Sequence, residues 1–166
     1  MLRATSGLIF SGGGIGLKSS GVLAQSAVPA SVTGTLSETT LATIAIPAGA
    51  MGVNGAIRIK SRWTYPNTAN VKTLNARING VLVEQKVEGS GFQITRTDWS
   101  GENRGAMNSQ IWDRNNSVGG AYEQNATFQT TAIDMSVAQN LTLTGTLANT
   151  GETITLEAYT VELLNP

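Results

Sequence analysis

The stretch that decides the fold is TLSETTLATIAIPAGAMGVNGAIRIKSRWTYPNTANVKTLNARING, which runs from Thr35 to Gly80. It contains three runs rich in apolar and β-branched residues, separated by two loops rich in Pro, Gly and Asn. Alternation of apolar and polar residues with a period of two is the pattern of a β-strand with one buried face. The stretch therefore predicts three consecutive strands of a β-sandwich.

The clearest alternation lies between Ala56 and Tyr65. The predicted inward face of this strand consists of Ile57, Ile59, Ser61, Trp63 and Tyr65. The predicted outward face consists of Arg58, Lys60, Arg62 and Thr64. Three cations in a row usually form a solvated face, and they are also candidate contacts for acidic groups of a partner protein.

The signals on either side of this strand define its neighbours. Residues Leu41 to Ile46 form a threonine-rich strand pattern that Pro47 ends, because proline has no amide hydrogen to donate to a sheet. The third run, Val71 to Ile78, is followed by Asn79-Gly80 and another apolar run. Asn-Gly between two such runs predicts a tight hairpin, since both central residues of a type I′ turn need positive φ.

Further strand patterns follow at roughly ten-residue spacing, and no segment has a convincing helical period. Residues 100–107 and 113–120 are predicted as loops. In the last strand, Thr153 to Leu163, the apolar side switches by one residue, which predicts a bulge or a bend. The chain is therefore predicted to be all-β, a jelly-roll-like β-sandwich of eight to nine strands.

Residues 1–30 are predicted to be an extended N-terminal arm, and residues 31–166 the sandwich domain. The arm is rich in Gly and Ser and carries only two charges, Arg3 and Lys18. Such a segment buries too little apolar surface to fold alone. A signal peptide is the alternative, but polar residues and Lys18 interrupt its apolar region. The candidate anchors of the arm are Leu8, Ile9, Phe10, Ile15 and Leu17.

Composition excludes several classes of function. The chain has no Cys and no His, which removes the commonest thiolate nucleophile, general base and metal ligands. Its 11 basic residues balance its 11 acidic ones, which argues against a nucleic-acid partner and a polybasic membrane anchor. No apolar run approaches the length of a membrane span. We expect no cofactor, no bound metal, no nucleic acid and no membrane partner.

Candidate catalytic residues are weak. Asp98, Glu102, Asp113 and Glu123 fall in the middle section, where loops are predicted. A pair of carboxylates supports glycoside hydrolysis only when burial raises the pKa of one of them, and solvated loops do not provide that. No Asp-rich calcium motif is present, and the glycines at 12–16 lack the lysine spacing of a phosphate loop. The chain is predicted not to be an enzyme, and a glycosidase is the last-ranked hypothesis.

Aromatic residues near the middle loops are candidate contacts for a glycan or for another subunit. These residues are Trp99, Trp112 and Tyr122. Trp63 differs from them, because it lies on the apolar face of its strand and is predicted to be in the core.

Part of the opening stretch resembles β-sandwich structural proteins of tailed bacteriophages. The resemblance covers Leu36 to Leu74 and rests on a threonine-rich strand, Ile46-Pro47-Ala48-Gly49, Gly55-Ala56-Ile57-Arg58-Ile59 and Asn70-Val71-Lys72-Thr73-Leu74. It implies a virion component, either a capsid decoration (cement) protein or a tail or fibre module. No catalytic motif comes with it.

Two functions follow from the resemblance. The first is a decoration protein on the outer surface of the phage head, made in the host cytoplasm, which binds the major capsid protein and copies of itself as a dimer or trimer. The second is a tail-associated or head-fibre adhesin that binds host glycans through the middle loops. The leading arm and the single small domain favour the decoration protein.

Overall fold

The computed structural model describes residues 20–114 and 127–165, and these residues form an all-β sandwich without a helix. The strands are β1 (Gly21–Ser26), β2 (Ala30–Thr33), β3 (Thr39–Ile46), β4 (Ala56–Thr64), β5 (Lys72–Ile78), β6 (Val81–Glu88), β7 (Ile94–Asn103), β8 (Gln110–Arg114), β9 (Thr127–Thr131), β10 (Gln139–Leu147) and β11 (Thr153–Leu164). The predicted fold class is confirmed. No helix within this part of the chain is long and apolar enough to cross a membrane.

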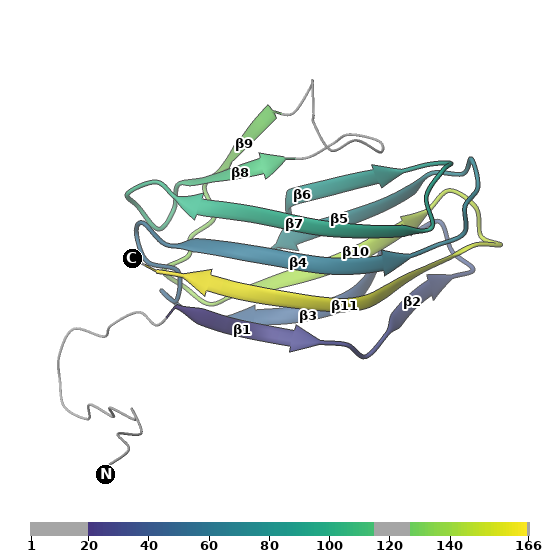
Figure 1. The fold of residues 1–166 in the computed structure, drawn as a ribbon. Coiled ribbons are helices and arrows are strands. Elements are labelled where there is room, and N and C mark those ends of the chain that lie inside the picture. The colour runs from purple at the N-terminus through teal and green to yellow at the C-terminus, as the bar shows by residue number, and fades with distance from the viewer. Residues whose placement is uncertain (1–19, 115–126, 166) are drawn as a thin grey trace, which may run out of the picture.

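The strands form two antiparallel sheets that lie one in front of the other (Figure 1). The seven-stranded sheet has the order β1-β11-β4-β7-β8-β9, and β2 also pairs with β11. The four-stranded sheet has the order β3-β10-β5-β6. The chain changes sheets between β2 and β3, β3 and β4, β4 and β5, β6 and β7, β9 and β10, and β10 and β11. This alternation is the jelly-roll arrangement, and β8 and β9 extend it at one edge.

The core lies between the inward faces of the two sheets. Trp63, Ile57 and Ile59 of β4 have no exposed surface, as the alternation in β4 predicts. Leu74 of β5 and Leu143 of β10 face them from the other sheet and are equally buried. Burial of these side chains is the main stabilising contribution to the sandwich.

Two local predictions about the backbone are confirmed. Asn79 and Gly80 have φ angles of 48° and 81°, and they join β5 to β6 as a tight hairpin. The register between β11 and β4 shifts between Leu156 and Ala158, so Glu157 is the extra residue of a bulge. This bulge explains why the buried side of β11 changes along the strand.

The boundaries of the arm and of one middle loop were predicted wrongly. Residues 21–26 and 30–33 belong to the sandwich, because β1 and β2 both pair with β11 along its free edge. Strand β1 lies within the predicted arm, and β2 begins at its last residue. These two additional strands are part of the reason why the structure has eleven strands and not the predicted eight to nine. Strand β7 continues to Asn103, so residues 100–103 are strand rather than loop. Residues 1–19, including the five apolar anchors, lie outside the described part.

Candidate functional site

The outer face of the seven-stranded sheet carries the predicted basic row. Arg58, Lys60 and Arg62 of β4 point away from the core, as predicted. Arg58 is engaged by Asp98 of β7 through a bidentate contact, in which Arg58 Nε donates to Asp98 Oδ1 at 2.6 Å. This guanidinium lowers the pKa of Asp98, mainly through the hydrogen bonds. Lys60 Nζ lies 3.9 Å from Glu162 Oε2. Two of the three cations are therefore paired within the sheet.

Arg62 has a different environment, because its cross-strand neighbour on β7 is another cation, Arg96. Both side chains are exposed. Among residues 20–114 and 127–165, no carboxylate lies within 4.0 Å of either guanidinium. On the other side of Arg62 the register places Ala158 of β11, which is small. Arg62 and Arg96 are therefore neighbouring arginines that no carboxylate in the described part of the chain neutralises, and the small residue Ala158 lies beside Arg62.

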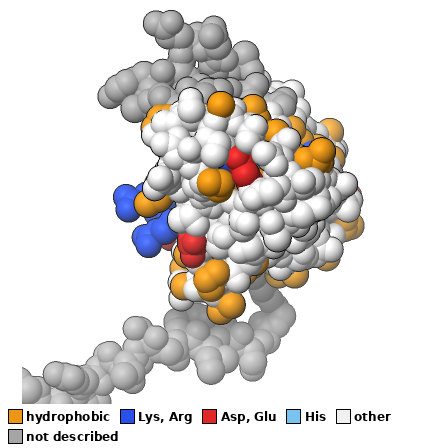
Figure 2. All heavy atoms as spheres, turned by 90° about the vertical axis from the view of Figure 1, so that its right-hand side faces the viewer, with side chains coloured by type: hydrophobic (Ala, Val, Ile, Leu, Met, Phe, Trp, Pro, Cys, Tyr) orange, Lys and Arg blue, Asp and Glu red, His pale blue; other side chains and the backbone are white. Residues whose placement is uncertain are grey.

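A surface hollow of about 670 Å³ lies over this row. Its described lining includes the long side chains of Lys60, Arg62 and Arg96, the smaller residues Ala27 and Ala158, and Asp98, whose carboxylate is paired with Arg58. In Figure 2 the outer face of the seven-stranded sheet, which faces the viewer in Figure 1, points to the left. Lys and Arg side chains gather along that left margin. We call the hollow with its two arginines the Arg62–Arg96 hollow. Its charge and shape suit an anionic group.

The two tryptophans predicted as glycan or subunit contacts are instead in the core, which corrects that prediction. Trp99 is 3% exposed and Trp112 has no exposed surface. The Trp112 Nε1–H donates to Thr131 Oγ1 at 2.9 Å, and its ring packs over Gly101. A buried ring cannot stack on a sugar. Tyr122, the third aromatic candidate, lies outside the described residues.

The candidate acidic residues are also placed differently from the prediction. Asp98 and Glu102 lie in β7 and Asp113 lies in β8, so they are strand residues on the sheet surface rather than loop residues. Glu123 lies outside the described part. Within that part, no group of three or more carboxylates is close enough to hold a metal ion.

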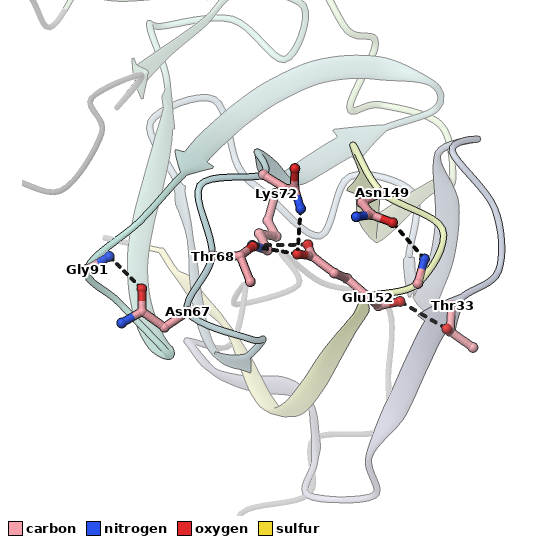
Figure 3. Close-up of polar contacts among 9 residues, drawn as sticks. Thr33, Asn67, Thr68, Lys72, Gly91, Asn149 and Glu152 are labelled. Atoms are coloured by element: carbon pink, nitrogen blue, oxygen red, sulfur yellow. Dashed lines mark hydrogen bonds and ion pairs between the residues drawn. The ribbon is translucent and has the colours of Figure 1, made fainter.

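A buried ionic cluster lies at the end of the sandwich where β5 and β11 begin, which is opposite the end where β11 finishes (Figure 1). Figure 3 shows Lys72, Thr68 and Glu152 of this cluster in contact. Lys72 has no exposed surface, and its Nζ lies 3.1 Å from Glu152 Oε2 and donates to Thr68 Oγ1 at 2.6 Å. Glu152 accepts further hydrogen bonds from Thr68 and, at 2.8 Å, from Asn70. Hydrogen bonds from these two side chains lower the pKa of Glu152. The cluster joins the loop after β4 to the turn before β11, and its role is structural.

A second, more exposed ionic cluster on the four-stranded sheet predicts acid sensitivity. Arg77 donates two hydrogen bonds to Glu38, at 2.7 and 2.9 Å, and Thr144 and Asn75 also donate to it. Mainly because of Arg77, the pKa of Glu38 falls from 4.5 to about 2. The stabilisation is therefore complete above pH 4.5, and it is lost as the pH falls toward 2.

Replacement of Glu38 by glutamine is expected to lower the melting temperature at neutral pH by a few degrees, and the difference from wild type should shrink progressively as the pH falls from 5 to 2. Thermal melts across this pH range measure it. Glu102→Gln is the matched control, because Glu102 has no hydrogen bond or ion pair with another described side chain. A difference in melting temperature between wild type and Glu38→Gln that stays constant from pH 5 to pH 2 would contradict the lowered pKa of Glu38.

Comparisons with known proteins add no functional information. No protein-family model matches the chain, and no curated protein matches it.

Sequence reasoning missed Arg96, Lys72 and Glu152. Arg96 carries no signal of its own in the sequence, because its pairing with Arg62 depends on the register of β4 and β7. Lys72 shares the parity of Leu74 and Ala76, so extending the alternation by two residues would have predicted that it points inward. Glu152 is 80 residues away from Lys72 in the chain, and no local signal connects them.

Proposed function

We propose that the chain is a non-enzymatic structural protein of a bacteriophage particle, and that it decorates and stabilises the assembled head. The observation that carries this proposal is the jelly-roll strand order. Jelly rolls build viral capsid and lectin domains, which is an analogy of fold. The segment that resembles phage structural proteins, Leu36 to Leu74, supplies β3, β4 and the start of β5, and thus contributes to both sheets.

The mechanism is reinforcement by mass action. A protein that binds only the assembled shell stabilises it by RT ln(1 + [L]/Kd) at each site. The partners are the major capsid protein and copies of the chain itself, and the location is the outer surface of the head. Burial of Trp99 and Trp112 removes two of the three aromatic residues that a glycan-binding adhesin would use, so decoration is the favoured function.

Adding the purified protein to particles that lack it is expected to give saturable binding and a higher temperature of particle disruption. Quantitative mass spectrometry of purified particles should find copies in proportion to the shell subunits. A few copies per particle, confined to the tail fraction, would overturn the proposal in favour of a tail protein.

The arm is tested by removing residues 1–19 and keeping Ser20, because the Ser20 hydroxyl donates to the Asn165 carbonyl at 2.8 Å. The truncated protein is expected to keep its fold and to bind particles more weakly. Undiminished binding would show that the sandwich alone docks. Cutting farther, into β1, would remove a strand of the sheet and would confuse the two effects.

A further inference from the structure

The strongest unassigned feature of the surface is the like-charge pair in the Arg62–Arg96 hollow. Like charges directly opposite each other on neighbouring strands are destabilising. Elsewhere on this face the cations have carboxylate neighbours: Arg58 has Asp98, and Lys60 has Glu162. Arg62 instead has another cation, Arg96, as its cross-strand neighbour, and both residues line the hollow. An anion held between the two guanidinium groups would remove the repulsion.

The chemistry of the site favours a carboxylate. A guanidinium presents its donors in a planar fork that matches the two oxygens of a carboxylate. Two such forks face one hollow, and Gln25 and Thr160 add polar groups to its lining. Arginine is also enriched at the centre of protein interfaces, where it contributes strongly to affinity.

Among the described residues no carboxylate lies within 4.0 Å of Arg62 or Arg96, which favours a carboxylate from another molecule. Residues 1–19 contain no Asp or Glu, so the N-terminal segment cannot provide it. Asp98 and Glu162 face the same sheet surface but already contact Arg58 and Lys60. Between residues 115 and 126 the chain has one acidic residue, Glu123, which lies outside the described part and is included in the test below.

We propose that the Arg62–Arg96 hollow is the docking site for an acidic segment of the protein partner, with one of its Asp or Glu side chains between the two guanidiniums. This inference rests on the proposed function, because it names the surface through which the domain binds its shell. A protein segment suits the site better than a sugar does. The one aromatic residue among the described lining residues, Tyr159, is half-buried and packs against the core, so it offers only part of one ring for stacking.

The first test uses a hexaglutamate peptide and follows the amide resonances of the full chain by NMR. Amide resonances around Arg62 and Arg96 are expected to shift when the peptide binds. Added salt should weaken this binding, because the two charges are exposed to solvent. Arg62→Glu and Arg96→Glu should each weaken peptide binding at least about tenfold. Arg104→Glu is the matched control: it makes the same charge change at an exposed position outside the lining and should bind as wild type does.

Three results of this first test would overturn the proposal. Equal binding by the Arg62→Glu and Arg104→Glu variants would remove the hollow as the site. Tighter binding of polysialic acid than of hexaglutamate would assign the site to an acidic saccharide. A Glu123→Gln variant that binds the peptide more tightly than wild type would show that the chain's own carboxylate occupies the hollow.

The second test separates this inference from the proposed function by measuring binding to particles. If the inference holds, wild type and Arg104→Glu bind, and Arg62→Glu and Arg96→Glu bind at least about tenfold more weakly while melting at no lower a temperature than wild type. If all four proteins bind equally, the docking site is wrong but the decoration function stands. If none binds while hexaglutamate binding still requires Arg62, the decoration function is wrong and the acidic-segment site stands.

Discussion

Replacing Gly101 with alanine is expected to destabilise the protein by about 3 kcal/mol. Gly101 lies in β7, and a Cβ built on it would lie 2.2 Å from Cε3 and Cζ3 of Trp112. The Trp112 ring is fully buried and its Nε1–H is held by Thr131, so the ring cannot move aside without losing that hydrogen bond. Overpacking against a fixed ring forces the backbone of β7 or β8 to shift, which costs free energy at the upper end of the usual range.

Urea denaturation followed by tryptophan fluorescence measures this loss. Gly21→Ala is the matched control, because Gly21 also lies in a strand, has no positive φ, and its Cβ would meet no atom within 4 Å. That control should change the free energy of unfolding by less than about 0.5 kcal/mol. The double variant Gly101→Ala/Trp112→Leu should lose less free energy of unfolding than the two single variants lose together, because leucine removes the clash with the new Cβ. Equal stability of Gly101→Ala and wild type would contradict the packing.

The same contact shows why the sequence predicted the strands better than the roles of the aromatic residues. The inward faces of β4 and β5 follow from alternation within each strand, and the hairpin at Asn79 follows from two adjacent residues. These signals are local. The burial of Trp112 depends on a glycine eleven residues earlier, which leaves room for the ring in the neighbouring strand. Without the pairing of β7 with β8, a tryptophan beside a predicted loop is expected to be exposed.

In the candidate site, too, local features could be predicted from the sequence and contacts between strands could not. The outward direction of Arg58, Lys60 and Arg62 was predictable from the period of β4. Which of these cations is neutralised was not, because it depends on the residues that β7 and β11 bring beside them. The register places Asp98 and Glu162 near the first two, and Arg96 beside the third. Charge along one strand can thus be predicted from sequence, whereas charge across a sheet requires the register.

Exchanging Glu152 for glutamine is expected to lower the melting temperature by roughly 5 to 10 °C, and clearly more than exchanging Lys72 for methionine. Glutamine leaves the Lys72 ammonium fully buried without the carboxylate that now lies 3.1 Å away. An uncompensated buried charge is costly. Methionine at position 72 instead fills a similar volume without a charge, and Glu152, which is 8% exposed, keeps its hydrogen bonds from Thr68 and Asn70.

The decisive comparison is the double variant Lys72→Met/Glu152→Gln, which is expected to be more stable than Glu152→Gln alone. Removing the lysine removes the cost that the first substitution creates, so the two effects are not additive. Because hydrogen bonds lower the pKa of Glu152, the stabilisation by its carboxylate is present at neutral pH and is lost in acid. The difference in melting temperature between wild type and Glu152→Gln should therefore be smaller at pH 3 than at pH 7. A double variant that is less stable than either single variant would show that the pair acts through its hydrogen bonds rather than through charge compensation.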